Sequence, residues 1–110
     1  MYIEFKTKKL RQQCQSLAAL RKAYGEVIAR QVVKRINALK AADRIEDLAP
    51  LPPTRCHPLK GSRKGQYAMN LGQPYRLIFE LLAETRIVRD ERGAKPECGV
   101  RILAIEDYHD

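Results

Sequence analysis

The sequence is poor in the residue types that build metal and redox sites. Its 110 residues include three cysteines, Cys14, Cys56 and Cys98, and two histidines. The odd number and wide spacing of the cysteines argue against a disulfide framework and for a reducing compartment. A zinc site made of Cys56, His57, Cys98 and His109 is conceivable but disfavoured, because adjacent residues rarely serve one structural zinc. We therefore expect no metal ion and no other cofactor.

Long apolar runs are missing as well. The first ten residues have no apolar core of signal-peptide length. The longest apolar stretch, residues 77–83, is interrupted by Glu80 and is too short to cross a bilayer. We expect a soluble cytoplasmic protein that has no membrane partner.

Several catalytic motifs are absent too. The sequence contains no glycine-rich phosphate loop, no HExxH and no GxSxG, which argues against nucleotide-binding P-loop proteins, zinc proteases of the HExxH type and serine hydrolases with a nucleophile elbow. Glu106 and Asp107 are adjacent, so on a strand they point to opposite faces and do not form a carboxylate cluster for magnesium. This spacing argues against a metal-dependent nuclease.

Positive charge is abundant and unevenly distributed. The formal net charge is +8, with 45% hydrophobic and 31% charged residues, and this balance is typical of a globular protein. Residues 1–40 hold ten lysines and arginines against two acids, residues 51–79 hold no acid, and residues 80–110 hold eight acids. The basic surplus favours a polyanionic partner. The length fits a single domain over residues 1–110.

The hydrophobic pattern predicts a strand, a helical hairpin and then further strands. Tyr2–Phe5 is rich in strand formers, and residues 8–24 and 26–42 carry apolar residues at helical spacing. Gly25 separates the two helices. In the second helix, Ile28, Val32, Ile36 and Leu39 form the apolar stripe, and Arg30, Lys34, Arg35 and Lys40 are expected to face outward. Residues 43–48 add one further helical turn.

The second half predicts an antiparallel sheet. We expect an edge strand at 56–59, a flexible basic loop at 61–65, and strands at 66–71, 75–82 and 100–105, followed by a tail from Glu106. Residues 83–99 are interpreted as a long loop with a strand extension near 86–88. The fold class is therefore α+β, with the N-terminal strand and the helical hairpin packed on an antiparallel sheet in two layers.

Bases, phenols and imidazoles remain as candidates for chemistry. His57 is flanked by Arg55 and Lys60, and His109 follows Tyr108. Cleavage of RNA without a metal needs a base for the 2′-hydroxyl proton, an acid for the leaving 5′-oxygen, and cations for the phosphorane charge. Each residue also has a structural interpretation: exposed or capping histidines, a tyrosine that pins the tail, and loop lysines that keep the loop hydrated.

Two motifs carry a family resemblance. Residues 55–79, RCHPLKGSRKGQYAMNLGQPYRLIF, and the ending IEDYHD resemble the HigB-like toxins of the RelE/ParE superfamily, also called plasmid-maintenance killer proteins. The shared segments are His-x-Leu-Lys-Gly, Gly-x-aromatic, an aromatic-Arg strand and a terminal Asp-Tyr-His, in the same order and spacing. The helical hairpin before them fits as well, so the resemblance covers most of the chain.

The resemblance implies a RelE-like fold and a ribosome-dependent endoribonuclease that cuts messenger RNA in the A site of the small subunit. Carried over by position, His57, Asp107, Tyr108 and His109 form the catalytic group. Phosphate or RNA binding falls to Lys60, Arg63, Lys64, Tyr67 and Arg76, where Arg76 has the alternative of anchoring the carboxylates of the tail. The implied partner is a HigA-like helix-turn-helix antitoxin, through which alone the toxin reaches operator DNA.

Other functions stay open at this point. Toxins of the ParE type act on DNA gyrase without cleaving RNA, although they lack the basic and histidine residues present here. An inactive module that binds RNA or the antitoxin is a further alternative. The sequence departs from the resemblance in three places: Tyr67 stands where many relatives have tryptophan, residues 83–99 are longer than the usual turn, and Asp110 follows the terminal histidine.

Overall fold

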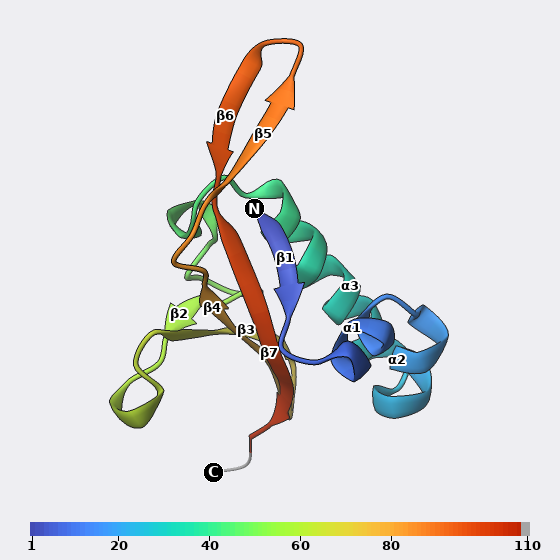
Figure 1. The fold of residues 1–110 in the computed structure, drawn as a ribbon. Helices are drawn as coiled ribbons and strands as arrows, with labels where there is room; N and C mark the ends of the chain where they lie inside the picture. Colours follow the sequence, from blue (N-terminus) through green and yellow to red (C-terminus); the bar gives the residue numbers. More distant parts are fainter. Residues whose placement is uncertain (109–110) are drawn as a thin grey trace.

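The structure is a computed structural model, in which residues 1–108 are described (Figure 1). The chain runs through β1 (Tyr2–Phe5), α1 (Lys8–Cys14), α2 (Leu17–Tyr24), α3 (Glu26–Ala41), η1 (Ile45–Asp47), β2 (His57–Pro58), η2 (Gly61–Arg63), β3 (Gln66–Gly72), β4 (Tyr75–Leu81), β5 (Arg86–Asp90), β6 (Gly93–Glu97) and β7 (Gly99–Asp107), where η1 and η2 are 3-10 turns. The predicted order of strand, helices and strands is confirmed.

One sheet and one helical layer form the body of the molecule. The sheet has the strand order β1-β7-β4-β3-β2, and the helices lie on one of its faces (Figure 1). Strands β2, β3, β4 and β7 pair antiparallel, whereas β1 pairs with β7 in parallel, so the sheet is mixed. The α+β class with a helical layer on the sheet is confirmed, and the parallel β1–β7 pair is an addition to the antiparallel sheet that we expected.

The core lies between α3 and the inner face of the sheet. Ile28, Val32, Ile36 and Leu39 of the predicted stripe are all buried. They pack in one cluster with the alternate residues of the strands, among them Met69, Leu71, Leu77, Phe79, Val100 and Ile102. This alternation sets the register, because a shift by one residue exposes the apolar set of a strand. It also directs every second residue of β3, β4 and β7 to the open face.

The predicted helix 8–24 is broken. Residues 8–24 form two short helices, α1 and α2, separated at Gln15 and Ser16. The Ser16 hydroxyl accepts a hydrogen bond from the backbone N–H of Ala19 at 3.1 Å and caps α2. A serine at this position favours a break in the helix. Its hydroxyl accepts a hydrogen bond from a backbone N–H of the next turn when a new helix starts at this residue. The expectation of one continuous helix was wrong.

Residues 83–99, expected as a loop, contain a β-hairpin instead. Strands β5 and β6 pair antiparallel from Arg86↔Glu97 to Asp90↔Gly93 and form a sheet of their own. The hairpin projects beyond the body of the molecule (Figure 1). Arg86 ties its base to β1, because its guanidinium lies 4.5 Å from the centroid of the Tyr2 ring and its Nη2 pairs with Glu97 Oε1 at 2.7 Å.

Two further expectations need correction. Arg35, predicted to face outward from α3, is buried with 7% exposure. Its guanidinium turns inward and donates to the backbone carbonyls of Asn70 and Pro53. Strand β7 continues to Asp107, so Glu106 belongs to the sheet and not to a tail. Pairing with β4 extends this strand, since Arg76 lies opposite Glu106 and Tyr75 opposite Asp107.

Candidate functional site

A cavity on the open face of the sheet brings several predicted site residues together. It has a volume of about 430 Å³. Its lining consists of Pro52, Arg55, His57, Ala68, Met69, Asn70, Gln73, Arg76 and Tyr108. His57 comes from β2, Arg76 from β4, and Tyr108 follows β7. Residues far apart in sequence meet here because β2, β3, β4 and β7 are neighbours in the sheet.

The imidazole of His57 has a defined orientation. Its Nδ1 lies 2.7 Å from the backbone carbonyl oxygen of Arg55. A carbonyl oxygen only accepts, so Nδ1 carries the proton and donates it to this bond. In the neutral ring, Nε2 then keeps its lone pair and is free to accept a proton. The side chain is exposed, so a ligand in the cavity reaches it.

The carbonyl that orients His57 belongs to a strained residue. Arg55 has a φ of 47°, in the left-handed region that non-glycine residues rarely adopt. Neighbouring hydrogen bonds hold this segment, with the N–H of Cys56 donating to Ala49 O at 3.0 Å and the N–H of Asn70 donating to Thr54 O at 2.8 Å. The surroundings therefore impose a backbone conformation that directs the Arg55 carbonyl to His57 and the Arg55 side chain to the cavity.

Arg76 connects the cavity to the end of β7. Its Nε donates to Glu106 Oε2 at 2.6 Å, and its guanidinium carbon lies 4.5 Å from the centroid of the Tyr108 ring. The guanidinium thus stacks on the ring as a cation–π pair. The N–H of Tyr108 donates to the Pro74 carbonyl at 2.9 Å, which also holds this residue beside β4. The expected alternative for Arg76, an anchor for carboxylates near the C-terminus, matches its contact with Glu106.

Glu106 also pairs with the basic loop. Arg63 Nη1 lies 2.9 Å from Glu106 Oε1, and Arg63 Nε donates to Gln66 Oε1 at 3.3 Å. The hydrogen bond from Arg63, followed by the bond and charge of Arg76, holds the pKa of Glu106 below its usual value, although partial burial opposes this shift. Glu106 is therefore an ionised carboxylate between two arginines at neutral pH.

Other predicted site residues lie away from the cavity. Tyr67 stands opposite Phe79 in the β3–β4 register, and its ring stacks on the Phe79 ring at the core face, with centroids 5.5 Å apart. Lys60 and Lys64 are exposed at the two ends of η2. Asp107 does not line the cavity, because it follows Glu106 on β7 and lies opposite Tyr75. His109 lies outside the described residues.

Sequence reasoning missed four residues as members of the site. Arg55, Asn70 and Gln73 line the cavity, and Glu106 joins two of the predicted arginines. The alternation of β3 and β4 was a usable signal for Asn70, since it lies opposite Arg76 in the register. The left-handed backbone of Arg55 has no sequence signal of that kind, because glycine or asparagine is the usual residue there.

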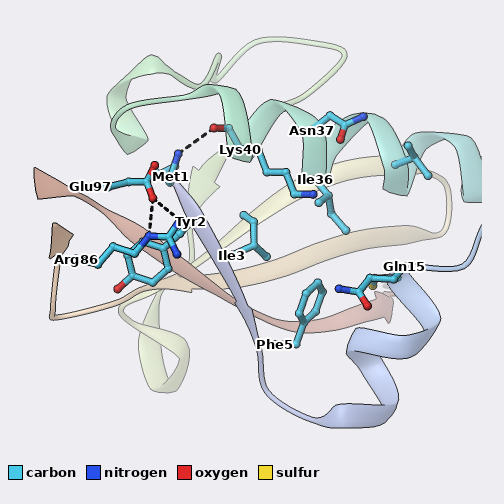
Figure 2. Close-up of a pocket in the computed structure, with 12 residues that line it drawn as sticks. Met1, Tyr2, Ile3, Phe5, Gln15, Ile36, Asn37, Lys40, Arg86 and Glu97 are labelled. Atoms are coloured by element: carbon cyan, nitrogen blue, oxygen red, sulfur yellow. Dashed lines mark hydrogen bonds and ion pairs between the residues drawn. The ribbon is translucent and has the colours of Figure 1, made fainter. Parts of the chain in front are cut away.

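A larger cavity lies elsewhere, between β1 and α3 (Figure 2). It has a volume of about 630 Å³, with apolar residues such as Ile3, Phe5 and Ile36 in its lining and Lys40, Arg86 and Glu97 also among its lining residues. Over residues 1–108, no three His, Cys, Asp or Glu side chains are grouped to hold a metal ion. Within the same part of the chain, no helix has the length and apolar character needed to cross a membrane.

Comparisons with known proteins agree with this architecture. The family model of the RelE-like toxin of the type II toxin–antitoxin system HigB matches residues 3–90. A YoeB/ParE toxin from Agrobacterium tumefaciens has the same fold, with a TM-score of 0.63 and 10% identity, over 99% of this chain and 100% of that one. The YoeB dimer from Staphylococcus aureus gives a TM-score of 0.57 and 11% identity, over 100% and 98%. A search of curated proteins finds no match in sequence.

Proposed function

Because the chain belongs to the HigB-like family of RelE-like toxins from type II toxin–antitoxin systems, we propose that it is a ribosome-dependent endoribonuclease. It cleaves messenger RNA in the ribosomal A site by acid and base chemistry of its own side chains, without a metal ion. The observation that carries this proposal is the convergence of His57, Arg76 and Tyr108 on one cavity. Together they supply an imidazole, a guanidinium and a phenol, which are the groups that this chemistry needs.

His57 is the base in this mechanism. Its Nδ1 is engaged by the Arg55 carbonyl, so Nε2 accepts the proton of the ribose 2′-hydroxyl. The freed 2′-oxygen attacks the adjacent phosphorus and forms a phosphorane. The bond from Nδ1 to the Arg55 carbonyl stays in place when the ring takes up this proton.

Cations and an acid complete the reaction. The guanidinium of Arg76, with Arg55 in the same cavity, stabilises the additional negative charge on the phosphorane. The leaving 5′-oxygen takes a proton from the Tyr108–His109 pair, of which Tyr108 lines the cavity. The carboxylate of Asp107 stabilises the protonated form of this pair. The P–O5′ bond breaks, and the products are a 2′,3′-cyclic phosphate and a 5′-hydroxyl.

The basic surface binds the polyanionic partner. Lys60 and Lys64 are exposed at the two ends of η2 and contact RNA phosphates, together with the basic N-terminal helices. Binding is therefore expected to weaken with salt, as counterions compete for the phosphates. The toxin acts in the cytoplasm, where ribosomes are present, and a HigA-like antitoxin holds it inactive and connects it to operator DNA.

The test is cleavage of ribosome-bound messenger RNA by purified protein, mapped by primer extension. Wild type is compared with His57→Ala and with Ser62→Ala, an exposed polar residue of the neighbouring turn. We expect cleavage that requires ribosomes, falls about 10²- to 10⁴-fold in His57→Ala, and is unchanged in Ser62→Ala.

Each other outcome changes the assignment. Growth arrest without cleavage by folded wild-type protein contradicts the nuclease and favours a toxin of the gyrase-directed type. Neither arrest nor cleavage favours a module that only binds RNA or the antitoxin. Full cleavage by His57→Ala removes His57 from the mechanism.

A further inference from the structure

Glu106 joins the basic loop to the residues that line the cavity, although it does not line the cavity itself. Its carboxylate lies between Arg63, from η2, and Arg76, from β4, at 2.9 and 2.6 Å. Three separate parts of the chain therefore meet at one side chain. The three side chains are only 20–34% exposed, so the contacts are shielded from water more than a typical surface pair.

The contact geometry determines how Arg76 is presented. Glu106 engages Nε, at the inner edge of the guanidinium, and leaves the two terminal nitrogens for other partners. The guanidinium carbon lies over the Tyr108 ring, 4.5 Å from its centroid. A free arginine has many rotamers, so an ionic anchor on one edge and a ring on its face restrict it to one orientation. Loss of the anchor releases both Arg76 and the ring.

The charge of Glu106 acts in the opposite direction on RNA affinity. A carboxylate close to the cavity repels phosphates, so its removal raises the local positive potential. A residue that is needed only for structure weakens binding and cleavage together when it is replaced. If Glu106 orients Arg76 while its charge repels phosphates, its replacement slows cleavage without weakening RNA binding.

We propose that Glu106 is a positioning residue for RNA cleavage, which holds Arg76, and through Arg76 the ring of Tyr108, in the orientation that the reaction uses. This inference rests on the proposed nuclease function. Glu106 does not touch the RNA. It acts only through the arginine that does.

The test compares Glu106→Gln with Glu80→Gln in single-turnover cleavage over a range of concentrations of messenger RNA–ribosome complex. Glu80 is a matched control, because it lies on the same face of β4 as Arg76 and pairs with Arg101 at 3.0 Å, away from the cavity. We expect the maximal rate of Glu106→Gln to fall about 10- to 100-fold. Its half-saturating concentration is expected to stay equal or decrease, whereas Glu80→Gln keeps both values within about twofold.

Two kinetic results overturn the inference. A maximal rate like that of wild type shows that Arg76 is oriented without Glu106. A raised half-saturating concentration with an unchanged rate shows that Glu106 serves RNA binding. If Glu106→Gln does not fold, Glu106→Asp takes its place. Its shorter side chain is expected to lower the maximal rate as well, and its retained charge to leave the half-saturating concentration unchanged.

A second measurement does not depend on cleavage. The Nε–H proton of Arg76, assigned by its loss in Arg76→Lys, is expected to resonate downfield and exchange slowly in the NMR spectrum of wild type and Glu80→Gln. It is expected to move to the position of a free arginine in Glu106→Gln, and an unmoved signal contradicts the anchor. Wild-type protein that cleaves no RNA overturns the proposed function instead, and the NMR result still decides whether Glu106 holds Arg76.

Discussion

Arg35 on α3 donates a hydrogen bond from its Nε to the backbone carbonyl of Asn70 on β3, at 2.9 Å. Its Nη2 also contacts the Pro53 carbonyl at 3.4 Å. The side chain therefore reaches from the helical layer to the segment that carries Arg55 and His57. Burial lowers the pKa of Arg35. A guanidinium stays protonated in proteins, so the group is a charged donor inside the fold.

Replacement of Arg35 by methionine is expected to reduce the free energy of unfolding by about 1–3 kcal/mol, because two carbonyls lose a charge-assisted donor. Urea denaturation measures this change. Lys34→Met is the control, since Lys34 is the exposed neighbour on the same helix and its loss removes the same charge. Equal stabilities of the two variants would show that the Arg35 contacts contribute nothing net.

Gly99 is expected to resist any side chain. A Cβ added at this position would overlap the ring of Tyr2, which is held by Arg86 and by the bond from its hydroxyl to Glu84 O at 2.8 Å. Gly99→Ala should therefore lower the free energy of unfolding by about 1–3 kcal/mol. In a Tyr2→Ala background the same substitution should cost less than about 1 kcal/mol. Additive effects in the double-mutant cycle would contradict the overlap.

The three thiols are expected to differ in reactivity. Burial raises the pKa of Cys14 and Cys56 to about 11, whereas Cys98 is exposed. At pH 8 only about one in a thousand of each buried thiol is ionised, and the thiolate is the reactive form. Titration of native protein with a chromogenic disulfide should show one fast thiol, absent in Cys98→Ser, and three after unfolding. A second fast thiol in native protein would contradict the burial.

The Glu106 ion pairs should give stability a defined pH dependence. Because the folded-state pKa of Glu106 is depressed, its contribution is present above the ordinary pKa of about 4.5 and is lost as the pH falls through the lower folded value. Wild type should exceed Glu106→Gln by about 1 kcal/mol at pH 7, with the difference vanishing in the acid range. Urea denaturation at a series of pH values checks this, and a difference that is constant with pH would disagree.

Periodic features of the fold were predictable from the sequence. The stripe from Ile28 to Leu39 and the alternation from Gln66 to Leu81 follow directly from which face is buried. The helix break at Ser16 was less apparent, because residues 8–24 have helical spacing throughout and one capping serine decides between one helix and two. Arg35 was misplaced for a related reason: charge alone predicts exposure, and its carbonyl partners come from distant segments.

The site was predictable where sheet register determines it. His57, Arg76 and Tyr108 meet because β2, β3, β4 and β7 follow one another in the sheet, with Tyr108 directly after β7, and their motifs had already marked them. Tyr67 was expected among the residues that bind RNA, and one-residue alternation turns its ring to Phe79 and the core. Glu106 was anticipated only as one of the tail carboxylates that Arg76 could anchor, and its second contact, with Arg63 43 positions away, has no local pattern in the sequence.

The hairpin β5–β6 is inserted between β4 and β7, and a backbone hydrogen bond closes its base. The N–H of Leu82 donates to the Gly99 carbonyl at 2.8 Å, and β4 and β7 pair directly below this bond. The excursion between these residues therefore changes neither the register of the sheet nor the cavity at its other end. A change in the length of this segment is expected to cost little free energy, since loop-closure entropy grows only slowly with length. The hairpin end of the molecule is therefore able to change in length without disturbing the cavity that His57 and Arg76 line.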